Sequence, residues 1–492
     1  MTNEKTMSVH EHWLSRNRAL AASGAFAAYA TGLAIYTGGA DRTWAIWAAV
    51  AYTVTTAMFL LTRRTKLPLM VPLLVSLGGA LGAPLIWLAT RVQPTPEVKV
   101  ISQSATLLLQ HGTPYLAPGQ LANWLSYNPY MPAMAVFGLP KALGATGLIA
   151  DPRVWMTLVS IALIAAAFWL AAPHLSCRSC SRNVAVSTVF AASSPVIAVP
   201  LAVGITDPPV IALLLVTLAL AARPGRRAMW AGVALGAASA LKSTAWPAVP
   251  IIAAMLATRD GVRAAWRFVG ITALVTGGLC ALMAPAALAD PPAFLQNTVL
   301  FPLGLTKHQT PAASPLPGHL LAMTGSAGHW VAVGLLLAAG LGFAISLIVR
   351  PPADARAAAL RIALGLAVMF TLAPATRWGY FVYPIGLIGW LALTGQGSAS
   401  EDQRSGGGTA LAPAAAAAAA AGAGISVGVG VAASTAVSRA SALALAGARF
   451  GMAAGWSMVS GLPPRLAAAR AKELMTRCAR LRHPEWALAH EV

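Results

Sequence analysis

Acidic side chains are scarce in this chain, so each one is a candidate for chemistry. The 492 residues include 14 Asp and Glu, and Glu97, Asp151 and Asp207 each stand close to a long apolar segment. A carboxylate at such a boundary can act as a general base on a hydroxyl or hold a cation. Asp151 and Asp207 are each followed by Pro and are equally good candidates for helix N-caps. Glu is a poor cap, so Glu97 ranks first as a base.

Isolated cations accompany these acids. Lys242 lies in an apolar stretch, and a charge at the centre of a membrane helix costs about 2.5–3.5 kcal/mol, so such residues are usually paired or functional. Arg377 is flanked by aromatic residues, and Lys307 with His308 forms a third basic site. Arginine and lysine both suit phosphate. The pattern indicates an anionic substrate, with snorkelling of Lys242 to the interface as the alternative.

The composition places these residues in a membrane protein. Hydrophobic residues make up 57% of the chain and charged ones 10%, against about 25% charged in soluble proteins. This excludes an ordinary soluble domain, a disordered chain and a disulfide scaffold, and it predicts an all-α polytopic protein with about twelve spanning helices. The predicted spans are 19–36, 44–61, 68–90, 153–172, 184–203, 208–222, 228–241, 246–257, 264–287, 328–349, 358–375 and 380–395.

The loop charges predict the orientation. Basic residues gather in one set of loops, at 63–66, 178–182, 223–227, 259–267 and 350–361. The opposite loops hold Arg42, Lys242, Lys307 and Arg377. Because basic loops remain cytosolic, the first set and the N-terminus are expected in the cytosol, with Glu97, Asp151 and Asp207 outside. This explains the net charge of +20 without a nucleic-acid partner. Segments 228–241 and 246–257 form either a hairpin, which keeps this alternation, or one long helix kinked at Pro247.

Three regions follow from this topology. Residues 1–18 form a cytosolic N-terminus, 19–395 the membrane domain, and 396–492 a low-complexity basic tail that is expected to be cytosolic, with a further span over 409–437 left open. Two long loops on the outer side, 91–152 and 288–327, are expected to carry function and helices lying on the membrane surface. We call them the first and second long loops.

Several stretches resemble a known family. An outer acid followed by a helical loop is similar to the first outer loop of GT-C glycosyltransferases, and in particular of glycosyltransferase family 87, which includes actinobacterial mannosyltransferases. The resemblance covers most of residues 90–395. The stretches that carry it are 97–115, 127–132, 151–153, 240–247, 301–305 and 377–384.

The resemblance implies a GT-C-like helix bundle and a chemistry. A sugar, with mannose expected, is donated with inversion from a polyprenyl phosphate to a hydroxyl of a lipid or glycan acceptor. Glu97 stands where the family usually has an aspartate base, and Lys242 and Arg377 map to the lipid phosphate. Asp151, Asp207, Lys307 and His308 are further substrate-binding candidates. Tyr115 and Tyr130, with Trp124 and Tyr127 beside them, either stack on sugar faces or serve as packing and interfacial anchors.

The sequence is also compatible with other functions. A transporter or lipid flippase, or an inactive membrane scaffold, would share the composition; the absence of a clear internal repeat favours the enzyme. No ligand spacing marks a metal site, so we expect no cofactor beyond the lipid-linked donor, with dependence on a divalent metal left open. The expected partners are membrane lipids, donor and acceptor, in a multi-pass protein of the plasma membrane.

Overall fold

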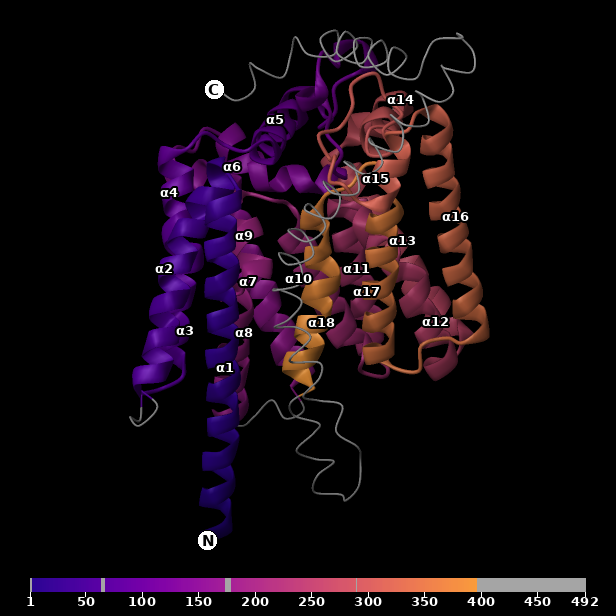
Figure 1. The fold of residues 1–492 in the computed structure, drawn as a ribbon. Coiled ribbons are helices and arrows are strands. Elements are labelled where there is room, and N and C mark those ends of the chain that lie inside the picture. The colour runs from indigo at the N-terminus through magenta and orange to yellow at the C-terminus, as the bar shows by residue number, and fades with distance from the viewer. Residues whose placement is uncertain (1, 63–66, 173–177, 289, 396–492) are drawn as a thin grey trace, which may run out of the picture. The chain divides into compact units, whose positions relative to one another are not determined.

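The computed structural model describes residues 2–62, 67–172, 178–288 and 290–395 (Figure 1). The predicted tail, 396–492, lies outside the described residues. The described residues form helices and turns without a β-strand, which confirms the all-α class.

The N-terminal helices pack by small residues and one buried indole. They are α1 Thr2–Tyr36, α2 Gly39–Leu61, α3 Met70–Leu77 and α4 Ala83–Arg91, the last two joined by a π-helical turn, Gly78–Gly82. A Cβ at Gly79 would collide with Ala51 of α2, so glycine permits the close approach. The buried Trp44 donates its indole N–H to the Ala80 carbonyl at 2.7 Å. This bond satisfies a carbonyl where the wider turn disturbs the helical pattern.

The next helices surround a fully buried one. They are α7 Pro152–Ala171, α8 Arg178–Ser193, α9 Pro195–Val203 and α10 Asp207–Ala221. The chain bends by 58° between α8 and α9, where Pro195 cannot donate a backbone hydrogen bond. Nearly every residue of α10 is buried, as expected for a helix that is apolar all round. α10 therefore forms the centre of the bundle.

The structure settles the uncertain pair of segments as a hairpin. The two helices are α11 Arg226–Leu241 and α12 Ala248–Asp260, separated by a 3₁₀ turn. Lys242, just after α11, pairs with Asp207 at the start of α10. Arg259, near the end of α12, donates to the Ala221 carbonyl at the other end of α10, at 2.7 Å. α11 and α12 therefore run in opposite directions along α10, which excludes the single kinked helix.

By length and composition, fewer helices qualify as membrane spans than the twelve that the sequence predicts. The remaining long elements are α13 Val262–Met283, α16 Ser326–Val349, α17 Ala355–Leu372 and α18 Val382–Thr394. Seven helices of the described chain are long and apolar enough to cross a membrane, or eight if the bent pair α8 and α9 counts as one span. The other predicted segments form shorter helices. The polytopic class is thus confirmed, and the number twelve stays a prediction.

The two long loops pack on each other at one end of the bundle (Figure 1). Their helices are α5 Pro96–His111 and α6 Leu139–Ala142 in the first loop, and α14 Pro291–Leu295 and α15 Pro317–Ala322 in the second. The side-chain oxygen of Asn297 accepts the backbone N–H of Asn128 at 2.8 Å, and the Asn128 amide donates to Pro114 at 3.2 Å. Tyr127 stacks on Phe301 with ring centroids 4.4 Å apart. These contacts fix the loops as one layer.

We expect Asn297→Ala to loosen this layer. Asn297 is fully buried, and its removal leaves the Asn128 N–H unsatisfied, at a cost of about 1–3 kcal/mol. Amide hydrogen exchange around Asn128 should become about tenfold faster or more. Asn123→Ala is the control, because that exposed side chain caps a turn of the same loop and water can replace it. Equal exchange in the two variants would contradict the role of Asn297.

Candidate active site

Short helices bring their ends together near the layer formed by the long loops. At 1.5 Å per residue the 15-residue α10 is about 22 Å long, less than the ~30 Å hydrocarbon core of a bilayer. α11 and α18 are similarly short, with 16 and 13 residues. Arg259 holds the ends of α10 and α12 together at one end of the bundle. The opposite ends of α10 and α11 meet at Asp207 and Lys242.

Gly204 positions two of the acids relative to each other. This residue ends α9 in the left-handed conformation, with φ of 102°, three residues before Asp207. A Cβ here would collide with Val98, the neighbour of Glu97 in α5. The Thr95 hydroxyl also donates to the Val203 carbonyl at 3.2 Å. The start of α5 is thereby held against the turn that leads into α10.

The first ion pair joins Lys242 to Asp207. The carboxylate of Asp207 is fully buried, and its Oδ1 accepts from Lys242 Nζ and, at 2.8 Å, from the Tyr383 hydroxyl. Since Tyr383 donates its single proton there, the Thr244 hydroxyl, 2.8 Å away, is the donor to Tyr383. Oδ2 is also buried and has no hydrogen-bond partner among the described residues. The alternative that Asp207 caps α10 is wrong, because Thr206 holds the N-cap position and no side chain caps the helix.

The second ion pair joins Arg377 to Glu97. The two residues are 280 positions apart in the chain. Backbone hydrogen bonds of 2.9 Å from Thr376 to Ala312 and from Ser314 to Thr376 tie the strand-like segment before Arg377 to the second long loop. The Glu97 side chain is 16% exposed and that of Arg377 is 35% exposed. Unlike Asp207, this carboxylate is within reach of a ligand.

Electrostatics keep the Arg377 guanidinium charged. Burial lowers its pKa, but the charge of Glu97, the nearby Tyr380 and the hydrogen bond to Glu97 together raise it by more, so the pKa of Arg377 lies above its ordinary value. Burial, followed by the charge of Glu97, raises the pKa of Tyr130 well above its usual range. Tyr130 is therefore a neutral hydroxyl at physiological pH.

Two tyrosine rings connect the ion pairs into one site. Lys242 Nζ lies 5.7 Å from the ring centroid of Tyr130 and 5.3 Å from that of Tyr380, within cation–π distance. The Tyr380 hydroxyl is in electrostatic range of all four charged groups, which are Lys242, Arg377, Asp207 and Glu97. Tyr115, which is buried, donates from its hydroxyl to the Tyr130 carbonyl at 2.8 Å and so supports that residue from behind. The predicted acid and the two cations thus share one site.

Asp151 is engaged in a local structure. Its Oδ1 accepts the backbone N–H of Arg153 at 2.9 Å, which makes it the N-cap of α7, and its Oδ2 accepts from the Arg153 guanidinium at 2.7 Å. Arg153 also donates to the Leu88 carbonyl at 3.1 Å. The N-cap alternative is confirmed for Asp151, in contrast to Asp207.

Lys307 and His308 lie over a different cluster. The His308 ring meets the Tyr127 ring edge-on at 6.3 Å, and Lys307 is exposed. Tyr127 belongs to a small apolar cluster with Leu121 and Phe301. The contacts of this basic site are therefore with the layer of long loops, beside rather than inside the group around Tyr380.

Sequence analysis did not single out Tyr383, Thr206 or Thr244 as site residues. Tyr383 lies in an aromatic run that is typical of a membrane interface, and threonines are common in membrane helices. The available signal was spacing: Tyr383 follows Arg377 by six residues, and Thr206 and Thr244 flank the charged pair. Among the described residues, no three His, Cys, Asp or Glu side chains gather as a possible metal site.

The arrangement combines a reachable carboxylate with two held cations. Glu97 can accept a proton from a hydroxyl, and Arg377 and Lys242 can stabilise an anion that forms beside it. The rings of Tyr130 and Tyr380 are flat apolar surfaces on which an apolar face of a ligand can pack.

Comparison with known proteins gives one family match. The family model of glycosyltransferase family 87 matches residues 128–374, half of the chain. The match includes Asp207 and Lys242, begins after Glu97 and ends just before Arg377. No curated protein matches the chain significantly.

We expect Lys242→Met to destabilise the protein and a second substitution to restore part of the loss. The variant leaves the fully buried Asp207 charge unpaired, at a cost of about 3–5 kcal/mol. The double variant Lys242→Met/Asp207→Asn removes both charges. Thermal unfolding of the detergent-purified chain measures the difference. If the double variant unfolds at the same temperature as Lys242→Met or at a lower one, the unpaired Asp207 charge is not the cause of the lost stability.

Proposed function

The chain belongs to glycosyltransferase family 87 and is a membrane glycosyltransferase, and from this premise we propose its reaction. It transfers a hexose, with mannose expected, from a polyprenyl-phosphate donor to a hydroxyl of a lipid or glycan acceptor. The anomeric configuration is inverted in a single displacement. The observation that carries the proposal is the Glu97–Arg377 pair beside Lys242 around the Tyr380 ring.

Glu97 is the base in this proposal. As the acceptor oxygen bonds to the anomeric carbon, its proton passes to the Glu97 carboxylate, and the bond from that carbon to the phosphate oxygen breaks. Asp207 is a weaker candidate because it is fully buried, with Oδ1 occupied by Lys242 and Tyr383. The partial exposure of Glu97 supports its assignment.

Arg377 and Lys242 stabilise the negative charge of the leaving phosphate. The donor phosphate is a diester with one negative charge and leaves as a monoester with a second, so cations at this position stabilise the transition state more than the ground state. Arg377 can bind phosphate through two parallel hydrogen bonds, whereas Lys242 acts as a point charge. A polyprenyl phosphate that competes for Arg377 also releases Glu97 from its ion pair. Donor binding therefore frees the base.

The tyrosines supply the remaining wall of the site. Tyr130 and Tyr380 already present their faces to Lys242, and a sugar bound beside the phosphate would contact the same rings. Tyr115 acts through Tyr130, whose carbonyl it holds. In this proposal Lys307 and His308, the latter beside the Tyr127 ring, contact an acceptor that enters over the long loops.

The site faces the outside of the plasma membrane in this proposal. Arg223 and Arg259 lie at the end of α10 opposite Asp207, in the basic loops that are expected in the cytosol. The polyprenyl chain stays in the bilayer while the reacting carbon lies beside Glu97 and Arg377.

We expect Glu97→Gln to lower transfer about 10²–10⁴-fold, the contribution typical of general base catalysis. The measurement is transfer of labelled mannose from polyprenyl-phosphate mannose to candidate acceptors by the purified chain. Glu97→Asp, which keeps a carboxylate one methylene shorter, should retain more activity than Glu97→Gln. The control is Asp290→Asn, at the cap of α14. Unchanged transfer by Glu97→Gln would remove this residue from the mechanism.

We expect Lys307→Cys to react from outside intact cells with a membrane-impermeant maleimide. Lys307 is exposed in the second long loop. Arg263→Cys, exposed at the start of α13 among the basic loops, should react only after the cells are opened. The unsubstituted chain, with its four cysteines, gives the background. The reverse pattern would place the site in the cytosol.

A further inference from the structure

A cavity lies between the two helices of the first long loop. It has a volume of about 270 Å³ and is formed where α6 packs beside α5. Gly138, at the N-cap of α6, permits this approach, because a Cβ there would collide with the Ile101 carbonyl and with Ala105 of α5. The residues that line the cavity are Pro94, Lys99, Ser102, Gln103, Thr106 and Lys141. All of them except the proline are polar.

The polar residues that α5 contributes lie on one face of the helix. They follow the spacing i, i+3, i+4 and i+7, which places them in a single stripe, and they are Lys99, Ser102, Gln103 and Thr106. The Thr106 hydroxyl donates to the Ser102 carbonyl at 3.2 Å. Ser102 is only 9% exposed, and its hydroxyl has no hydrogen-bond partner among the described residues. This hydroxyl is therefore available to a ligand in the cavity.

Two lysines line this cavity without a partner charge. Neither the ammonium group of Lys99 nor that of Lys141 has an ion pair or a hydrogen bond within the part of the chain that the structure describes. Glu97 lies about 200° from Lys99 around the axis of α5 and pairs with Arg377. Asp151 is held by its local ion pair. Two unneutralised cations beside one cavity repel each other and attract an anion.

The segment after Lys141 carries exposed apolar side chains at a membrane boundary. Leu143 is 73% exposed and Ile149 is 62% exposed. The segment ends at α7, which is long and apolar enough to cross a membrane, and the Trp155 indole of α7 donates to the Ile149 carbonyl at 2.8 Å. Apolar side chains beside a lysine and a tryptophan are typical of a segment that lies in the bilayer interface. Lys141 therefore lies next to the surface of the bilayer.

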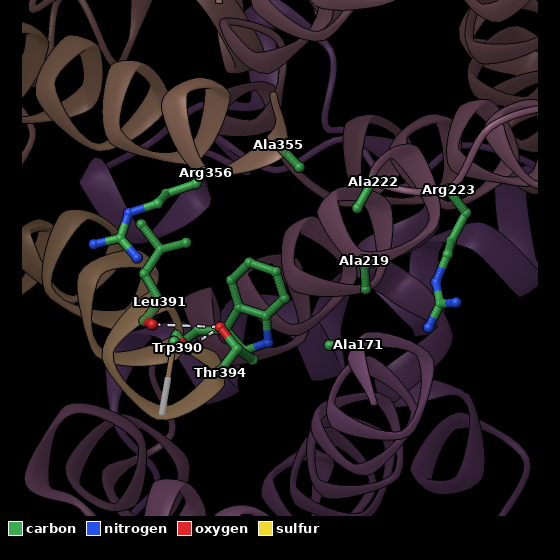
Figure 2. A pocket seen from close by; sticks show the side chains of 10 residues that line it. Ala171, Ala219, Ala222, Arg223, Ala355, Arg356, Trp390, Leu391 and Thr394 are labelled. Carbon is green, nitrogen blue, oxygen red and sulfur yellow. Dashed lines mark hydrogen bonds between the residues drawn. The ribbon is translucent and has the colours of Figure 1, made fainter. Parts of the chain in front are cut away.

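A larger cavity, at the end of the bundle where α7 and α10 end, lacks this arrangement. It has a volume of about 430 Å³ and is lined by Arg223, Arg356 and the Trp390 ring (Figure 2). The two guanidinium groups lie on opposite sides of the indole and point apart, so they do not form one anion site. Lysine ammonium groups end flexible four-carbon chains, and the two that line the smaller cavity can both turn to one anion.

We propose that the cavity between α5 and α6 binds the phosphate group of an anionic membrane lipid. Lys99 and Lys141 pair with the phosphate as point charges. The Ser102 hydroxyl donates to one of the phosphate oxygens. The acyl chains enter the bilayer beside the exposed apolar side chains that follow α6. A lipid bound in this way anchors α5, the helix that carries Glu97, to the membrane surface. The lipid lies on the other face of α5 from Glu97, so its binding does not depend on the transfer reaction.

The test is the binding of defined lipids to the full chain in detergent, measured by native mass spectrometry. Phosphatidylglycerol should bind about tenfold more tightly than zwitterionic phosphatidylcholine. Lys99→Gln and Lys141→Gln should each weaken the binding of phosphatidylglycerol about fivefold, the contribution of one lysine beside an anionic lipid surface. Lys141→Arg, which keeps the charge, should bind like the unsubstituted chain. Because both lysines are exposed, these substitutions leave the fold intact.

Arg42→Gln is the matched control. Arg42 is exposed at the start of α2 and does not line the cavity, so this variant removes the same charge from another membrane boundary. Equal affinity for the two lipids, or equal weakening by Arg42→Gln and Lys141→Gln, would overturn the proposal. Inorganic phosphate that binds as tightly as phosphatidylglycerol would also overturn it, because the acyl chains would then contribute nothing. Loss of the lipid preference in the two lysine variants but not in Arg42→Gln would support it.

Discussion

The buried ion pair between Lys242 and Asp207 constrains how the helices of this protein can end. A carboxylate with no exposure is tolerated only if a partner charge and hydrogen-bond donors reach it. Lys242 can do so only because α11 ends beside the first turn of α10, and the Tyr383 hydroxyl because α18 begins there. The pair therefore fixes the ends of three short helices to one point, beside which the candidate site lies.

The two ion pairs of the site differ in a way that matters for chemistry. Asp207 is enclosed, so its charge serves to hold Lys242 and Tyr383 in place. Glu97 is partly exposed, and its partner Arg377 is more so, which means that an incoming anion can compete for the guanidinium. In the proposed reaction, such a site keeps its cations ordered before the donor binds and releases Glu97 as the base when it does. This suits a displacement in which negative charge moves onto a phosphate.

The family match and the site overlap only in part. Residues 128–374 match the family model and include the central helix α10 and the α11–α12 hairpin. Glu97 and Arg377 lie on either side of that segment, and the packing of Val98 on Gly204 and the pairing of Ala313 with Thr376 bring them to it. The opposite end of the bundle carries the second concentration of arginines, around the cavity beside Trp390. The molecule thus presents cations at both of its ends.

The sequence by itself determined the class of fold, the positions of the apolar helices and the short list of charged residues, because each of these is a local signal of composition and periodicity. It also allowed the cap at Asp151, a contact between neighbours. Only the tertiary structure decided that Asp207 pairs with Lys242 instead of capping its helix, that Tyr383 joins them, and that Glu97 meets Arg377 across 280 residues. These contacts depend on where helix ends meet in space, and no local pattern encodes that.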